Sequence, residues 1–355
     1  MRIKRYTRVI ALALLVLMLS GCDRGMVIPT EKPGADDSVS RTVFAMDTVM
    51  ELSPCGENAK AACDLGAARI QELESLFSVT RKDSEIYSVN HAQGKEVSLS
   101  PDTQTLLKDA LYWCAQTDGM LDISIYPVLR TWGFTTGEYR VPDDAELASL
   151  LEHVDYRRVS LSPDGSAITL PEGMEIDLGS VAKGYTGDMV MQAFRDSGVT
   201  SGMISLGGNV QVLGTKPDGS NWRIAVQDPS ADGYVGIAEV ADKAVITSGG
   251  YERFFEQDGV TYWHILDPET GKPAHSGVVS ATVIGTSGTM CDALSTALFV
   301  MGAERAAAFW QTHADAGFDF VLVLEDGSLV MTEGVESSFT PVDSWASAPI
   351  EVIRR

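Results

Sequence analysis

The most informative stretch of this sequence is Ile176-Asp177-Leu178-Gly179-Ser180-Val181-Ala182-Lys183-Gly184-Tyr185. The apolar run 174–178 predicts a strand, and the small and hydroxyl residues after its glycine predict a helix over 180–196. Ser180 could cap this helix, and Lys183 would fall in its first turn. Free backbone N–H groups, the helix dipole and the lysine would then point at one spot, as phosphate binding requires. A capped helix with a solvated lysine explains the residues equally well.

A second predicted helix also begins with residues that could bind a ligand. An apolar strand is expected over 281–284 and a helix over 289–301. Asp292 and Thr296 are four residues apart and share one helical face, a spacing of two oxygen ligands that suits a hard cation such as Mg²⁺. The simpler explanation is that the aspartate favours the helix dipole and the threonine bonds its own backbone. On the residues alone, that explanation is favoured.

The rest of the chain predicts an α+β fold. A first strand is expected over 42–52, and helices over 57–77, 102–117 and 143–152. From residue 159 onward the chain alternates apolar strands with turn signals, and no steady βαβ rhythm emerges.

Composition excludes several classes of protein. The 355 residues carry a net charge of −22, with 45% hydrophobic and 21% charged residues. Such a chain can build a large core, so a disordered acidic protein is excluded. Nucleic acid is disfavoured as a partner, because the acidic surface repels phosphate backbones.

The N-terminus resembles a bacterial lipoprotein signal. A basic start and a short apolar run end in Leu19-Ser20-Gly21-Cys22. We expect residues 1–21 to be a signal peptide, Cys22 to carry fatty acyl chains such as palmitate, and 22–41 to be a flexible tether. The domain would then be held at the cell membrane, facing the periplasm or the extracellular side. Ordinary secretory cleavage and a free core cysteine are the alternatives.

Four further cysteines remain, and their spacing fits neither a metal knuckle nor a CxxC redox motif; they are Cys55, Cys63, Cys114 and Cys291. Their pairing stays open.

Three other motifs are ambiguous when read alone. The glycine pairs within 205–209 and 247–251 permit close approach of a ligand, but a simple bulge explains them as well. His264 lies in a run that reads as a strand entering a tight turn. A lone histidine is usually structural, although this one could line a cleft.

Taken in order, these segments resemble the FAD:protein FMN transferases, the ApbE family. The resemblance spans residues 42–335 and rests most on two runs, Asp177 to Gly184 and His264 to Gly271, followed by Asp292-Ala-Leu-Ser-Thr-Ala. The other matching segments are Met46-Asp47-Thr48, 84–90, 121–123, 132–134, 205–209 and 246–251.

The resemblance implies a single α+β domain of mixed and antiparallel sheets packed with helices over 42–335, with 336–355 as a C-terminal extension. It also implies an enzyme that binds FAD and, with Mg²⁺, transfers FMN to a threonine hydroxyl of an exported acceptor protein and releases AMP. Subunits of membrane redox complexes are the typical acceptors.

Residue roles follow from the same resemblance. The metal site matches Ser180, Asp292 and Thr296. The cofactor contacts match Met46, Ile86, Tyr87, Asp122, Asp177, Lys183, His264 and Ile265. His264 is the candidate for activating the acceptor threonine, and Asp177 could accept a proton or hold a cation.

Four positions depart from the family's usual pattern: Asp47, Ser180, Gly250 and Cys291. A side chain at 47 or 180 could crowd the cofactor, whereas the backbone carbonyl of Ser180 could still bind metal.

Two other functions stay open. One is an FAD pyrophosphatase in which water replaces the threonine, and the other is a lipoprotein that binds FAD without turning it over. A solute-binding lipoprotein is disfavoured, because such chains usually show two lobes with βαβ rhythm.

Overall fold

The computed structural model describes residues 39–355 and is built on one nine-stranded sheet. In spatial order its strands are β1 (Arg41–Ala45), β2 (Thr48–Cys55), β6 (Ser201–Leu206), β7 (Asn209–Leu213), β10 (Ala244–Gly249), β13 (Val278–Gly285), β14 (Asp319–Leu324), β15 (Leu329–Thr332) and β17 (Ile350–Ile353). All neighbours are antiparallel except β15 and β17.

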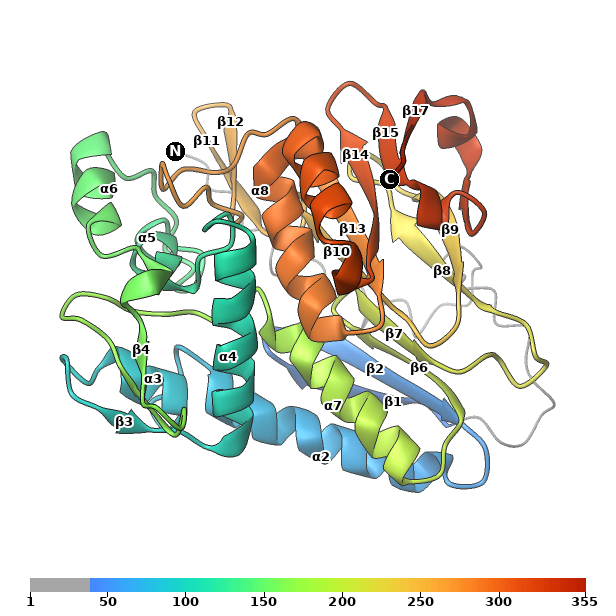
Figure 1. The fold of residues 1–355 in the computed structure, drawn as a ribbon, viewed down its shortest axis with the longest axis horizontal. Coiled ribbons are helices and arrows are strands. Elements are labelled where there is room, and N and C mark those ends of the chain that lie inside the picture. Colours follow the sequence, from blue (N-terminus) through green and yellow to red (C-terminus); the bar gives the residue numbers. More distant parts are fainter. Residues whose placement is uncertain (1–38) are drawn as a thin grey trace, which may run out of the picture.

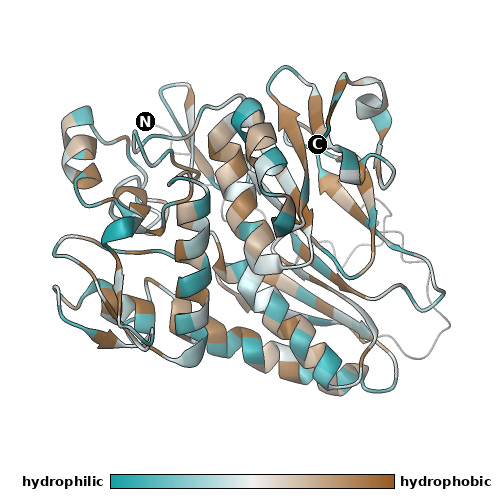
Figure 2. Cartoon of the chain, in the orientation of Figure 1, coloured by the Kyte–Doolittle hydropathy of each residue, from teal (hydrophilic) through white to brown (hydrophobic). Residues whose placement is uncertain are grey.

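Helices cover one face of this sheet (Figure 1). They are α2 (Ala59–Phe77), α7 (Ala182–Asp196) and α8 (Gly288–Thr312), with α4 (Pro101–Gln116) packed beside α8. In Figure 2, α2 and α7 alternate between teal and brown, as expected of helices with one buried face. The first half of α8 is buried almost all round, so it forms the centre of the core.

A smaller antiparallel sheet covers the opposite face. Its strands are β8 (Trp222–Gln227), β9 (Tyr234–Val240) and β16 (Phe339–Pro341). Apolar side chains of this sheet meet those of the large sheet, Ile224 and Val235 against Val245 and Val323. The segment 336–355, expected as an extension, contributes β16 and β17 to these sheets and Trp345 to the core between them.

The remaining elements lie beside the helical face (Figure 1). They are α3 (Glu85–Asn90), a short 3₁₀ turn η2 (Ile123–Ile125), α5 (Tyr126–Thr131), α6 (Asp144–Leu151), the hairpin β11 (Phe254–Gln257) and β12 (Val260–Trp263), and the small sheet of β3 (Val97–Ser98), β5 (Ala167–Thr169) and β4 (Ser160–Leu161). The α+β fold with mixed and antiparallel sheets is confirmed.

The expected helices are confirmed to within two residues, including the end of the helix predicted over 289–301. At Gly302 the backbone adopts a positive φ of 78°, which breaks the helical geometry inside α8. The apolar pattern therefore ended where the first straight segment ends.

Two strand predictions were wrong. The expected strand 42–52 is a hairpin, because Met46 and Asp47 both have positive φ (49° and 59°) and reverse the chain between β1 and β2. The expected strand 174–178 joins no sheet: it is an extended segment whose backbone bonds to side-chain and backbone groups of other elements.

Within residues 39–355 no helix is long and apolar enough to cross a membrane. Cys55, Cys63, Cys114 and Cys291 are all free thiols. The expected signal peptide, Cys22 and most of the tether lie outside the described residues, whereas Arg41, assigned to the tether, begins β1.

Candidate active site

The starts of α7 and α8 meet, and Asp292 lies at their contact. The residue is 3% exposed, and its Oδ2 accepts a hydrogen bond from the Gly184 backbone N–H at 2.8 Å. Asn209 of β7 donates to Oδ1 at 2.9 Å, and the Lys183 ammonium is 3.8 Å from the same oxygen. Burial raises the pKa of Asp292, and the neighbouring Lys183 lowers it.

The helices can approach so closely because residue 184 is glycine. A Cβ at this position would lie 2.2 Å from the Gly288 carbonyl oxygen and 2.7 Å from the Asp292 Cβ. Any other residue would push α8 away from α7. The glycine after Lys183 is therefore required by packing.

Hydroxyl groups continue the site along α8. The Thr296 hydroxyl is 3.5 Å from the Asp292 carbonyl oxygen and 3.3 Å from the Ser248 hydroxyl at the end of β10. Ser248 also bonds to Ser295 at 2.8 Å. Asp292 and Thr296 thus come from one helical face, as their spacing predicted, with Ser248 opposite them.

This donor set suits a hard cation. It combines one buried carboxylate with neutral oxygens, the ligands that Mg²⁺ prefers. Each carboxylate oxygen of Asp292 accepts one hydrogen bond from an uncharged donor in the structure, so each keeps a further acceptor site. In the part of the chain that is described, no three His, Cys, Asp or Glu side chains gather in a way that could hold a metal.

Asp177 lies on the extended segment that enters α7. Asn90 of α3 bonds to both the N–H and the carbonyl of Ile176 at 2.8 Å, and the Asp177 N–H donates to the Ile123 carbonyl at 2.8 Å. The carboxylate accepts from the Gly179 N–H at 3.1 Å. Burial raises the pKa of Asp177, while the charges of Arg253 and Lys183 lower it, so both cations lie near this carboxylate.

The helix start itself differs from the prediction. Val181 takes the cap position of α7 with no side-chain bond, and Ser180 lies in the turn before it, so Ser180 does not cap the helix. Most first-turn N–H groups are also used: that of Ala182 donates to the Leu178 carbonyl and that of Gly184 to Asp292. The positive charge of the site therefore comes mainly from side chains.

His264 directly follows β12, one residue beyond the strand on which it was expected. Its Nδ1 is 3.3 Å from the Arg253 carbonyl oxygen, which can only accept, so Nδ1 carries the hydrogen. Burial, together with Arg253 and Lys183, lowers the pKa of His264 to about 3. The imidazole is thus neutral and Nε2 is a proton acceptor.

Glu252 and Arg253 are functional candidates that the sequence reasoning missed. The charge of Arg253 lowers the pKa of Asp177, Glu252 and His264, so its side chain lies near all three. The Glu252 side chain is accessible to solvent, yet the surrounding protein raises its pKa to about 7, with Asp292 contributing and Lys183 opposing. The signal was available, because these two charges follow the glycine pair of 247–251 almost directly.

The other predicted cofactor contacts come from several elements. Met46 lies in the β1–β2 turn, and its sulfur accepts a hydrogen bond from Thr186 of α7 at 3.9 Å. Ile86 is fully buried on α3, and Tyr87 beside it stacks on His91 with ring centroids 3.8 Å apart.

Asp122 and Ile265 have structural surroundings. The Asp122 carboxylate caps η2 through the Ser124 N–H and hydroxyl, and also accepts from the Tyr156 N–H at 3.0 Å. Ile265 is 5% exposed and belongs to the main core. Neither side chain bonds to Asp177, Lys183 or Asp292 in the described structure.

One site of this α+β domain brings together three groups: a lysine at a helix start, a buried carboxylate among hydroxyls, and a neutral imidazole. They define an enzyme of the phosphoryl-transfer class, in which positive groups stabilise an anionic substrate and a base activates a hydroxyl. Residues 46–319 match the model of the ApbE family. The chain belongs to the ApbE family of FAD:protein FMN transferases.

Similar proteins extend over almost the whole chain. The FAD:protein FMN transferase of Vibrio cholerae is 34% identical, over 94% of this chain and 97% of its own length. That of Treponema pallidum is 31% identical over 78% of this chain and 80% of its own. The crystal structure of the ApbE protein of Thermotoga maritima superposes with a TM-score of 0.81 at 32% identity, covering 85% of this chain and 99% of the other.

Proposed function

We propose that this enzyme transfers FMN from FAD to a threonine hydroxyl of an acceptor protein and releases AMP. The observation that carries the proposal is the meeting of the α7 and α8 starts, where Lys183 and Asp292 are 3.8 Å apart and the charge of Lys183 also acts on His264 and Asp177. The names of the relatives support the same reaction.

The proposed transfer forms one P–O bond and breaks another. The threonine oxygen attacks the phosphorus of the FMN half of FAD, and the pyrophosphate P–O bond breaks. The bond's electron pair leaves with AMP, and His264 Nε2 takes the threonine proton. Lys183 and Arg253 offset negative charge as it develops on the departing phosphate.

A Mg²⁺ ion fits the oxygens at the start of α8. Asp292, Thr296 and the Ser180 carbonyl are the residues proposed to hold it. When bound, it would neutralise pyrophosphate charge. Lys183 and Asn209 keep the carboxylate of Asp292 oriented without such an ion.

We further propose that the enzyme acts at the outer side of a cell membrane, anchored by lipid on Cys22, and that its acceptors are exported segments of membrane redox complexes. The Leu19-Ser20-Gly21-Cys22 sequence supports the anchor. Two or more acyl chains would hold the domain stably at the bilayer.

The decisive experiment uses the full chain in detergent with FAD, Mg²⁺ and a candidate acceptor, against the same acceptor with its threonine changed to valine. We expect covalent flavin, seen by intact mass, only on the threonine form, with AMP in equal amount. Release of FMN and AMP without covalent product would instead identify a pyrophosphatase, and intact bound FAD a binding protein. Either result would overturn the proposed transfer.

The anchor is tested separately with Cys22→Ala in cells fed a labelled fatty acid. The wild-type chain should label and sediment with membranes, whereas the variant should do neither, because the cysteine sulfur is the acylation point. Cys55→Ala serves as the matched control. Equal labelling of the Cys22 variant would show that the N-terminus has been misread.

A further inference from the structure

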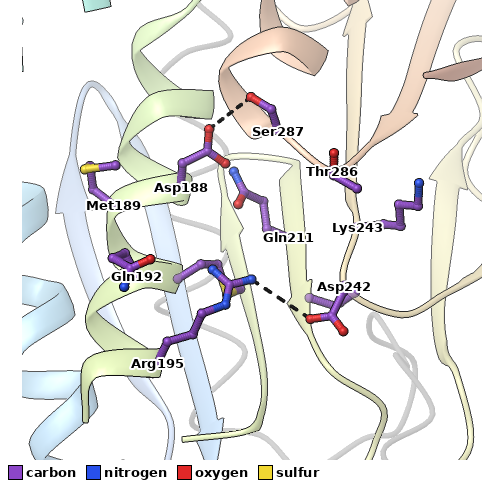
Figure 3. A pocket seen from close by; sticks show the side chains of 11 residues that line it. Asp188, Met189, Gln192, Arg195, Gln211, Asp242, Lys243, Thr286 and Ser287 are labelled. Carbon is purple, nitrogen blue, oxygen red and sulfur yellow. Dashed lines mark hydrogen bonds and ion pairs between the residues drawn. The ribbon is translucent and has the colours of Figure 1, made fainter. Parts of the chain in front are cut away.

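Asp188, one and a half turns beyond Lys183 on α7, bonds to the start of α8. Its Oδ1 accepts from the Gly288 N–H at 2.7 Å, and its Oδ2 accepts from the Thr289 N–H at 2.9 Å and the Thr289 hydroxyl at 2.8 Å. Figure 3 shows Asp188 directed at Ser287, the cap residue of α8, whose hydroxyl is 3.4 Å away. A carboxylate that accepts several such bonds at a helix start is held firmly in place.

The contact is reciprocal. Asp188 of α7 binds the first-turn N–H groups of α8, and Asp292 of α8 binds the first-turn N–H of Gly184 on α7. Gly288 and Asp292 are one helical turn apart, so fixing Gly288 also fixes the position of Asp292 along the helix axis. We call this pair of links the Asp188–Asp292 clamp.

Strand β7 supports the clamp from below. Asn209 and Gln211 are two residues apart and therefore point to the same face of the sheet. Asn209 donates to Asp292 at 2.9 Å, and Gln211 donates to the Gly184 carbonyl at 3.0 Å. Both amides are buried, at 3% and 5% exposure. The sheet thus holds one partner from each helix.

We propose that Asp188 is a positioning residue for the flavin transfer: by fixing the start of α8 against α7, it holds Asp292 and Lys183 in the geometry that acts on the pyrophosphate. The inference rests on the proposed function for its chemistry, whereas the clamp itself rests on the contacts above. Asp188 bonds to none of Asp292, Lys183 and His264 among the described contacts, so it acts through α8.

A cavity of about 250 Å³ borders the clamp, lined among others by Asp188, Gln211, Lys243 and Ser287 (Figure 3). Asp188 is therefore partly accessible, and its replacement by asparagine needs no extra volume. The amide NH₂ of asparagine would face N–H donors, so the clamp should loosen while the chain still folds.

The test compares Asp188→Asn with Asp196→Asn, an exposed aspartate at the end of the same helix. Amide hydrogen exchange should accelerate in Asp188→Asn at Gly288, at Thr289 and also at Gly184, whose N–H donates to Asp292 and not to the Asp188 side chain. In FMN transfer, kcat should fall about tenfold or more, with KM for FAD changed less than about threefold, because misplaced reacting groups cost rate more than binding. Asp196→Asn should match the wild type in both measurements.

Thr289→Val is the second variant, since it removes one bond to Asp188 and keeps both backbone donors; it should change both readouts in the same direction and by less. Unchanged exchange at Gly184, or an unchanged kcat in folded Asp188→Asn, would overturn the positioning role and leave Asp188 as a helix cap. A wild-type chain that transfers no FMN would overturn the proposed function. Hydrogen exchange at Gly184 would still show whether Asp188 holds the two helix starts together.

Discussion

The surroundings of Asp292 determine whether this carboxylate is only a helix-start residue or part of a site. Its carboxylate is buried, bonded to Gly184 and Asn209, and paired with Lys183, so it is held in one orientation at the place where a cation would bind. A carboxylate in a first helical turn is common, and only these contacts distinguish this one.

We predict that Asp292→Asn loses Mg²⁺-dependent turnover and keeps its fold. Asparagine retains the shape and one acceptor oxygen but not the charge that a hard cation requires. Calorimetric Mg²⁺ titration should show affinity lowered at least about tenfold, with a melting temperature close to that of the wild type. Asp315→Asn, an exposed control, should bind as the wild type does. Undiminished Mg²⁺ affinity in Asp292→Asn would remove this residue from the metal site.

His264 should stay neutral well below its ordinary titration range. Burial, Arg253 and Lys183 lower its pKa to about 3, whereas the unfolded chain takes up this proton near pH 6.5. The folded state is therefore favoured by this residue above pH 6.5, and that contribution is lost as the pH falls toward 3. Nitrogen NMR should show an uncharged ring, protonated at Nδ1, from pH 8 to pH 5, with His264→Gln assigning the signal. A midpoint near 6.5 would contradict the lowered pKa of His264.

The β1–β2 hairpin shows how an aspartate is accommodated at position 47. Both turn residues have positive φ, a conformation that glycine adopts freely and aspartate tolerates better than most. Asp47 is exposed on this turn.

We predict that Asp47→Val lowers the free energy of unfolding by about 1–2 kcal/mol, because a β-branched residue is strained at positive φ. Asp47→Asn should be nearly neutral, since asparagine also accepts this conformation. Urea unfolding of both variants measures the difference. Equal stability of the two would mean that the turn relaxes without cost.

For the whole molecule, the C-terminal segment closes the second face of the large sheet. Trp345 is 8% exposed, packs in the core between the sheets, and donates its indole N–H to Asp228 at 2.6 Å. The segment is thus part of the domain's core.

Trp345→Ala should accordingly cost about 3–5 kcal/mol of unfolding free energy, from lost burial and an empty cavity. Tyr112→Ala, which truncates an aromatic residue that is 53% exposed, should cost much less. Thermal and urea unfolding test both. A loss at Trp345 no greater than that at Tyr112 would show that 336–355 is dispensable for stability.

Most of the helices could be predicted from the sequence, because a helix with one buried face shows a local periodicity of apolar residues. The helices over 59–77, 101–116 and 144–151 and the break at Gly302 follow from apolar spacing and glycine. The hairpin at Met46 was missed because neither turn residue is glycine. The segment 174–178 was misassigned because its partner is the Asn90 side chain, which no periodicity records.

The sequence by itself determined the α+β class, the family and most of the site's residue types, because motifs at helix starts are local in the chain. Tertiary structure alone decided which of them act together. Lys183 and Asp292 are more than a hundred residues apart and meet only because glycine at 184 lets two helices touch. Glu252 and Arg253 became candidates through the charges around them, and His264 became a neutral imidazole through burial and neighbouring charge. These surroundings depend on atoms brought from elsewhere in the chain.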